Sequence, residues 1–378
     1  QGAKADRGPL GRSGLAFRWV QKGEMVMCKI TILTPGDAEV LLKYFTGVSA
    51  ALSKRFDLGF IPDEEHLTSL LCELLDDRGA ALHSLSYSIS DLNADLQKQG
   101  SLLQAAVSLQ TTSYNKHQER YSTQSDFGII LEYKDYLIPS DSFKKGVLVQ
   151  AKRLFPDSQK NYTLGSKYES FNADQHERLS RLREYYVHRD NEDEEQGRKH
   201  RECMERKMHH ENGCHDAFQY LLYNPSYTVL PKRDQELILH RQLSRESNRI
   251  FDYTHGLFLY EKLKSPAGTT ALLDSSNVFV GMDTAHALAE KAASAGRGKA
   301  SLMPFDLNSL TESHDIREMS FPWYLVFRLM YGTAGCSLSD FLKLVSGSDP
   351  GMANEYGITP PRYVLNVMLT AGTNSNKD

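Results

Sequence analysis

An aspartate and a Gln-x-Lys pair occupy two neighbouring segments whose composition predicts β-strands. Asp126 precedes the apolar run 127–131, and Gln150 and Lys152 end a valine-rich run. Alternate residues of a strand share a face, so Gln150 and Lys152 point to one side while the valines point to the core. A hairpin centred near residue 139 would place Asp126 opposite Lys152. The sequence therefore predicts one polar site across two paired strands.

These residue types suit metal-assisted hydrolysis of a phosphodiester. An aspartate such as Asp126 is an oxygen ligand for a hard cation, and Mg²⁺ usually takes one or two carboxylates and keeps several waters. Lys152 would orient the attacking water or offset charge that grows on the phosphate. Gln150 would bring its amide oxygen near the metal. The competing interpretation is a half-buried hairpin with ordinary polar edges, because short patterns recur by chance.

A leucine-rich segment upstream predicts a helix that begins after Asp63, a residue type favoured as an N-cap. At 100° per residue, Glu64 lies about 60° from the leucine stripe and Glu65 roughly 160° from it, so only Glu64 borders the buried face. Glu64 is the candidate carboxylate, although acidic residues in a first helical turn are common for the dipole alone. Glu119 is the alternative candidate, or a solvated loop residue.

Asp126, Gln150 and Lys152 together resemble the active-site signature of the PD-(D/E)xK nuclease superfamily. Within it, the pattern is similar to the Gln-x-Lys variant of Mrr-type restriction nucleases and prophage defence nucleases. The resemblance covers about residues 60–230. This chain has Ser125 where a proline is usual, and Gln150 replaces the usual second acid.

The resemblance implies a restriction-endonuclease-like α/β fold, with a mixed central sheet flanked by helices. It also implies Mg²⁺ or Mn²⁺ as the cofactor, DNA as the substrate, and a role in restriction or anti-phage defence. In such a role a partner protein of the defence system and a homo-oligomer are both possible. The implied metal ligands are Asp126, Glu64, Gln150 and Glu119. The superfamily often has a downstream glutamine near its site, and Gln175 is the candidate here, against a plain surface residue.

Charge and composition are compatible with a nuclease. The formal net charge is −4 and the pI about 6.4, which argues against a general polyanion-binding protein. Phosphate affinity depends instead on a local basic surface. Lys145 and Arg153 are candidate nucleic-acid contacts near the predicted site, although surface lysines also serve solubility alone.

The chain divides into three expected parts. Residues 1–26 are expected to be a disordered leader or tag remnant, and residues 27–265 the nuclease domain with a charged insertion near 188–215. Residues 266–378 are expected to be mainly helical. Other expected elements are strands over 28–33 and 217–223, and helices over 37–53, 80–98, 168–186 and 339–346, with one more beginning at Pro322.

Five widely spaced cysteines indicate no disulfide framework and fit a reducing, cytoplasmic compartment. No apolar run is long enough to span a membrane. The sequence holds no Walker loop, GxSxG elbow, dinucleotide fingerprint or tandem repeat.

Two other functions remain open from the sequence. The first is a catalytically silent nucleic-acid-binding or assembly protein on the same fold. The second is a zinc-stabilised interaction module, since one stretch gathers zinc-ligand residue types: His200, Cys203, His209, His210, Cys214 and His215. A solvated, charged helical insertion explains that stretch better, because it contains no paired Cys-x-x-Cys.

Overall fold

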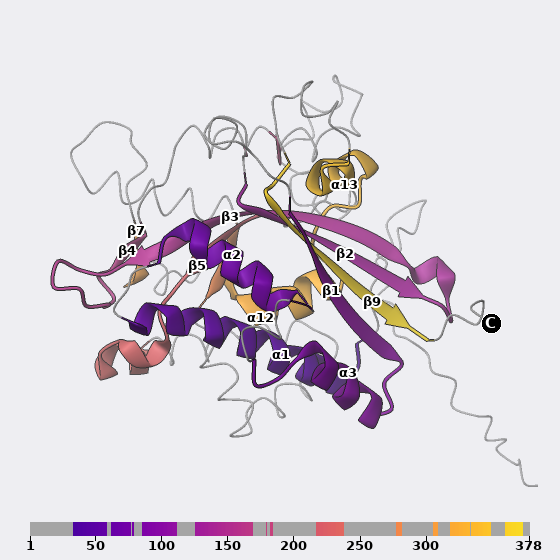
Figure 1. Cartoon of the computed structure of the whole chain (residues 1–378), viewed down its shortest axis with the longest axis horizontal. Helices are drawn as coiled ribbons and strands as arrows, with labels where there is room; N and C mark the ends of the chain where they lie inside the picture. The colour runs from indigo at the N-terminus through magenta and orange to yellow at the C-terminus, as the bar shows by residue number, and fades with distance from the viewer. Residues whose placement is uncertain are drawn as a thin grey trace, which may run out of the picture.

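A computed structural model of the chain describes residues 33–58, 62–76, 78, 85–111, 125–168, 179, 182–183, 217–237, 277–281, 305–308, 318–332, 334–348 and 360–372. The centre of the molecule is a nine-stranded mixed sheet whose main path runs β1-β9-β2-β3-β5-β6-β8 (Figure 1). Off this path, β4 pairs with β3, and β7 pairs with β4. The strands are β1 (Leu103–Thr111), β2 (Phe127–Asp135), β3 (Phe143–Phe155), β4 (Lys167–Tyr168), β5 (Phe218–Tyr223), β6 (Val278–Gly281), β7 (Phe305–Asp306), β8 (Glu318–Ser320) and β9 (Tyr363–Ala371).

The sheet mixes parallel and antiparallel neighbours. β2 and β3 form an antiparallel hairpin, while β5 runs parallel to β3. β9 lies between β1 and β2, antiparallel to the first and parallel to the second. Helices flank this sheet, so the α/β class with a mixed central sheet, expected from the sequence, is confirmed.

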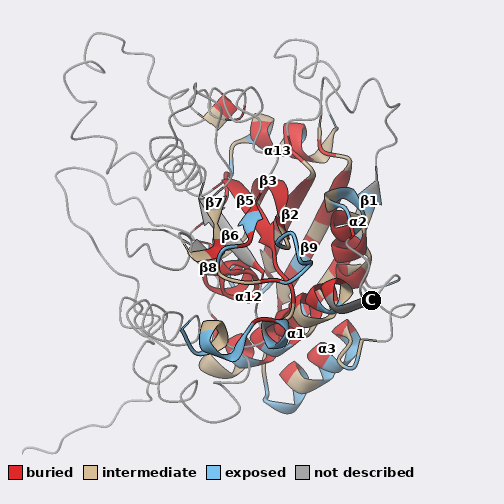
Figure 2. Ribbon diagram, turned by 90° about the vertical axis from the view of Figure 1, so that its left-hand side faces the viewer, coloured by how far each residue is buried: buried red, intermediate tan, exposed pale blue. Residues whose placement is uncertain are grey.

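The α-helices are α1 (Pro35–Ser53), α2 (Glu64–Leu75), α3 (Ile89–Lys98), α12 (Phe321–Trp323) and α13 (Ser339–Ser346). Short 3₁₀ helices are η1 (Lys54–Leu58), η2 (Pro139–Asp141) and η3 (Tyr227–Val229), and η4 (Tyr324–Met330) is π-helical. α1, α2 and α3 lie on one side of the sheet and α13 on the other (Figure 1). Buried residues gather on the strands and on the helix sides turned toward them (Figure 2).

Two glycines allow α13 to approach the β2–β3 hairpin closely. A Cβ added at Gly128 would lie 2.7 Å from a methyl group of Val345, and one at Gly146 would lie 3.2 Å from the Phe341 ring. Contacts this short force the neighbour to move, so larger residues at these positions would push α13 away from the hairpin.

Side-chain caps fix where the three N-terminal helices begin. Thr34 and Asp37 form a capping box at α1, and Ser88 and Asp91 form another at α3. At α2 the Asp63 carboxylate accepts the His66 N–H at 2.7 Å, which confirms the predicted N-cap. The leucine stripe of α2 is buried as expected: Leu67, Leu70, Leu71, Leu74 and Leu75.

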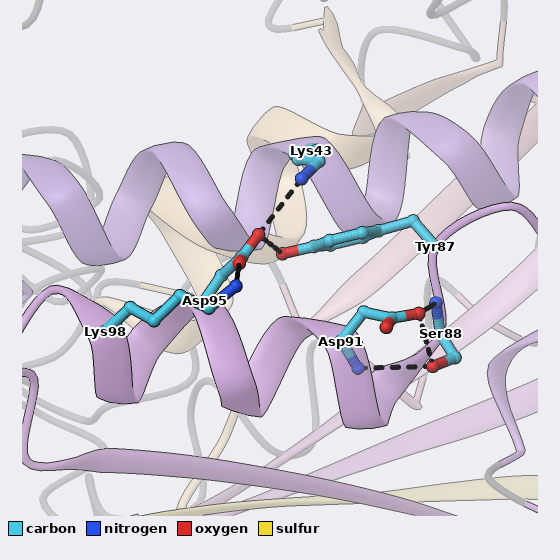
Figure 3. A network of polar contacts seen from close by, with 6 residues as sticks. All are labelled: Lys43, Tyr87, Ser88, Asp91, Asp95 and Lys98. Atoms are coloured by element: carbon cyan, nitrogen blue, oxygen red, sulfur yellow. Dashed lines mark hydrogen bonds and ion pairs between the residues drawn. The ribbon is translucent and has the colours of Figure 1, made fainter.

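A polar network ties α3 to α1 (Figure 3). The Asp95 carboxylate accepts from Lys43 of α1 at 3.0 Å, from Tyr87 at 2.9 Å and from Lys98 at 3.2 Å. These donors, with Lys43 first, lower the pKa of Asp95 to about 2. Because these groups are largely exposed, solvent screens them and the network contributes orientation more than stability.

Among the described residues, side chains and no further strand cover the outer edge of β1. The Asn93 amide donates to the Ala105 carbonyl and accepts the Ala105 N–H, each at 2.9 Å. Asp76 accepts the Leu109 N–H at 3.0 Å, and Ser101 accepts the Leu103 N–H at 3.1 Å. An uncovered edge strand is a template for pairing with another chain, so these side chains protect the sheet.

The C-terminal third differs from the mainly helical region expected from the sequence. It does contain the predicted helix 339–346 and the predicted helix start at Pro322. It also supplies β6, β8 and β9 to the same sheet, and β9 occupies an interior position. The nine residues of β9 are mostly apolar and buried, and such a run has no period that distinguishes strand from helix.

No helix in the described part of the chain has the length and apolar character that crossing a membrane requires. Cys336 is buried and disulfide-bonded, a pairing that the spacing of the cysteines did not predict, while Cys72 is a buried free thiol. The predicted strand 28–33 and most of the predicted helix 168–186 lie outside the described residues.

Asn93→Ala should expose the β1 edge. The Ala105 N–H and C=O would lose their partner, which costs about 1–3 kcal/mol, and the edge could then pair with a second copy. We expect a lower melting temperature and concentration-dependent association in sedimentation velocity. Gln104→Ala, an exposed change on the same strand, is the control. Equal behaviour of the two variants would contradict the covering role of Asn93.

Candidate functional site

The register of the β2–β3 hairpin places Asp126 beside Gln150. Phe127 pairs with Val149, and the Asp126 N–H donates to the Val149 carbonyl at 2.9 Å. The sequence predicted Lys152 opposite Asp126, and that prediction is wrong by two residues. The turn is centred one residue earlier than expected, because the Asp135 carboxylate accepts the N–H groups of residues 137 and 138 at 2.8 Å each.

Asp126 is bound to the end of β3 through its carboxylate. One oxygen accepts the Ala151 N–H at 2.6 Å and also accepts from the Gln150 amide. Gln150 is 3% exposed. The predicted pair of an aspartate and a glutamine is therefore brought together, with the glutamine amide as donor to the carboxylate.

Glu64 reaches the same place from the first turn of α2. One of its carboxylate oxygens lies 3.3 Å from Lys152 Nζ, and the other accepts the Arg153 N–H at 3.4 Å. The helical phase predicted from the leucine stripe thus leads to contact with β3. Glu65, the next residue, is exposed and pairs with Arg362, just before β9.

Lys152 is almost fully enclosed by the protein. Its side chain is 5% exposed, whereas that of Glu64 is 24% exposed. A buried ammonium group requires a partner charge, since leaving it unpaired costs several kcal/mol. Glu64 is that partner, and it is also the more solvent-exposed residue of the pair.

The electrostatics join these four residues into one cluster. Burial raises the pKa of Asp126 from 3.8 to about 6, the nearby Lys152 charge and the Ala151 N–H oppose this rise, and the Glu64 charge adds to it. Two carboxylates therefore lie close enough to repel each other. A bound cation would relieve that repulsion and favour the ionised form of Asp126.

β5, which was not among the elements predicted to form the site, borders this cluster. β5 runs beside β3, with Gln150 next to Tyr220 and Arg153 next to Tyr223. Burial, followed by the Asp126 charge, raises the pKa of Tyr220, so this phenol stays neutral. The sequence predicted the strand itself and its burial, but the partner of an apolar strand is not encoded locally.

The two basic candidates have different environments. Arg153 stacks its guanidinium 3.8 Å from the centre of the Phe155 ring, and its Nη1 is buried without a hydrogen-bond partner among the described residues. Lys145 instead donates to the Gly332 carbonyl and pairs with Leu131 in the hairpin. That is five positions along β2 from Asp126, or about 17 Å.

The donors of the cluster suit a hard cation. Two carboxylates, Asp126 and Glu64, converge with one amide, Gln150, and Mg²⁺ takes this many protein ligands while keeping waters. Within the described ranges, no group of three or more His, Cys, Asp or Glu side chains could hold a metal ion. Glu119, Gln175 and the stretch from His200 to His215 lie outside the described residues.

The raised pKa of Asp126 predicts a pH-dependent stability. Between about pH 4 and 6 the folded protein holds a proton on Asp126 that the unfolded chain has released, so stability falls as pH rises through this window. Asp126 keeps part of its surface exposed, which makes the penalty smaller than full burial would impose. Asp126→Asn should lack this fall and gain stability relative to the parent as pH rises.

Melting temperatures of parent and Asp126→Asn, measured without metal from pH 4 to 8, check this expectation. The difference between the two proteins removes the contribution of other titrating groups. A difference that stays constant across the window would show that burial does not disfavour the charged Asp126.

Comparison with known proteins gives no match: no family model fits the chain, and neither a curated protein nor a solved structure is significantly similar to it.

Proposed function

We propose that this chain is a metal-dependent nuclease of the PD-(D/E)xK type, with a restriction-endonuclease-like core. The observation that carries the proposal is the convergence of Glu64, Gln150 and Lys152 on Asp126, from one helix and two paired strands. The sequence predicted that these residues form one site. In the structure they lie together although they are up to 88 residues apart in the chain.

In this proposal Asp126, Glu64 and Gln150 hold Mg²⁺ or Mn²⁺. The cation, when bound, acts as a Lewis acid on the phosphate and lowers the pKa of a bound water. The Ala151 N–H and the Gln150 amide orient the Asp126 carboxylate. Lys152, held by Glu64, offsets negative charge that develops on the phosphate.

The nucleic-acid substrate, with DNA favoured, comes from the resemblance together with the basic candidates. Of the two basic candidates, Arg153 is the nearer to the cluster, next to Lys152 on β3, although its side chain points to the opposite face of the strand and its Nη1 is buried. Restriction or anti-phage defence in the cytoplasm, with or without a partner protein, rests on the resemblance alone.

A second candidate function is a catalytically silent nucleic-acid-binding or assembly protein. It is favoured because the polar groups of the cluster bind one another. Asp126 accepts two hydrogen bonds, and Glu64 and Lys152 form an ion pair. Such a network stabilises a fold without any metal. The two functions differ in whether the protein cleaves a phosphodiester bond when Mg²⁺ or Mn²⁺ is added.

Lys152→Met is the sharpest test of catalysis. Methionine keeps the buried aliphatic stem and removes only the charge, whereas alanine would open a cavity at this enclosed position. Cleavage of plasmid DNA with Mg²⁺ or Mn²⁺ should fall by ~10² or more, the scale of one electrostatic catalytic group. Linear DNA and RNA are assayed in parallel to define the substrate.

Lys144→Met is the matched control, since Lys144 is an exposed lysine on the same strand and pairs only at the surface with Glu132. It should cleave like the parent. Parent protein that cleaves none of the three substrates with either metal would favour the silent alternative. Equal cleavage by Lys152→Met and parent would remove Lys152 from the mechanism.

Glu64→Gln and Glu65→Gln separate two adjacent carboxylates on one helix. Each variant loses one negative charge, but only Glu64 contacts Lys152 and Arg153. Glu64→Gln should slow cleavage and weaken Mn²⁺ binding at least 10-fold, the scale of a ligand-shell change. Glu65→Gln should do neither. A greater loss at Glu65, measured by calorimetry and plasmid nicking, would mean that Glu64 is not the helix ligand.

A further inference from the structure

Glu64 is the first residue of α2, in the turn where helices fray. A carboxylate that holds a cation must stay within about 0.5 Å of its productive position. The Asp63 side chain accepts from the His66 N–H, and Lys152 and the Arg153 N–H hold the Glu64 carboxylate. A contact that fixes the main chain of Glu64 relative to the strands would complete this arrangement.

A buried hydroxyl chain meets this need. The Thr68 hydroxyl donates to the Glu64 carbonyl at 2.9 Å, and its oxygen lies 3.0 Å from the hydroxyl of Tyr223 on β5. A threonine hydroxyl has a single hydrogen, so Tyr223 must be the donor to Thr68. Tyr223 is 0% exposed and Thr68 is 1% exposed, so this hydrogen bond is shielded from bulk solvent.

One pair of neighbouring residues on β3 and β5 contacts both the side chain and, through Thr68, the main chain of Glu64. Tyr223 pairs with Arg153 in the parallel ladder between β5 and β3. The Arg153 N–H donates to the Glu64 carboxylate, while Tyr223 reaches the Glu64 carbonyl through Thr68. The main chain of Glu64 is thus linked to β5, and its side chain is linked to β3, the strand beside β5.

We propose that Tyr223 and Thr68 are positioning residues that set the Glu64 carboxylate against Lys152 and Asp126 for divalent-cation binding. The proposal rests on the proposed function for its effect on cleavage, but the positioning itself is a property of the fold. Burial raises the pKa of Tyr223 well above its ordinary value. The phenol therefore remains a donor at every pH at which the protein is assayed.

Three variants of the full-length chain test this arrangement. Tyr223→Phe removes only the terminal donor, Thr68→Val removes the relay at constant shape, and Thr68→Ser restores the hydroxyl. Tyr168→Phe is the matched control, because Tyr168 is an equally buried tyrosine whose hydroxyl donates to Asn224 at 2.5 Å, a residue outside the Tyr223–Thr68–Glu64 chain. It reports the general cost of losing one buried hydroxyl.

Mn²⁺ alone, titrated by electron paramagnetic resonance, is the binding probe, and plasmid cleavage with Mg²⁺ is the kinetic one. Tyr223→Phe and Thr68→Val should bind Mn²⁺ about 10- to 100-fold more weakly, the scale of a change behind a metal ligand. Thr68→Ser and Tyr168→Phe should stay within about twofold of the parent, as expected for positions that leave the ligand oriented. The proposal would be overturned if Tyr223→Phe bound Mn²⁺ as tightly as the parent while Glu64→Gln had lost Mn²⁺ binding.

Amide hydrogen exchange separates this result from failure of the proposed function. Tyr223→Phe should speed exchange in the first two turns of α2 at least 10-fold, and Tyr168→Phe should not, because local opening follows the lost contact. If this outcome is seen but the parent binds no Mn²⁺, the positioning role of Tyr223 stands and the proposed nuclease function is wrong. Unchanged exchange in Tyr223→Phe would overturn the positioning even if the parent cleaves DNA.

Discussion

The ion pair between Lys152 and Glu64 is the interaction on which the rest of the site depends. Lys152 is nearly inaccessible to solvent, so its charge must be balanced inside the protein. Glu64 balances it only because α2 begins at that point and is phased with its leucines toward the sheet. The same pair brings a second carboxylate near Asp126 and creates the repulsion that a cation would relieve.

The sheet supports this arrangement from both ends of the sequence. β9 lies between β1 and β2, so the strand that follows Asp126 is bounded by a segment more than 200 residues downstream. On the other side, β5 fixes β3 and carries Tyr220 and Tyr223 to the cluster. α13 packs closely on the hairpin where Gly128 and Gly146 leave room. A local motif is thus rigid because distant segments complete its sheet.

Local signals in the sequence predicted the local features of the site. The Asp63 cap, the leucine phase of α2, the hairpin and the apolar strand 218–223 all follow from spacing and turn chemistry. The pairing of β9 with β2, and of β5 with β3, depends on contacts between segments far apart in the chain. The hairpin register failed for a different reason, because the Asp135 side chain tightened the turn.

The central claim is that Asp126 and Glu64 share a divalent cation. Crystals of the protein soaked in Mn²⁺ and recorded near the manganese absorption edge would test it directly, because the anomalous signal locates the ion without reference to activity. The account predicts one strong peak within coordination distance of both carboxylates, about 2.0–2.3 Å for oxygen ligands of such a cation. A map with no peak there at saturating Mn²⁺, with the Lys152–Glu64 pair intact, would contradict it.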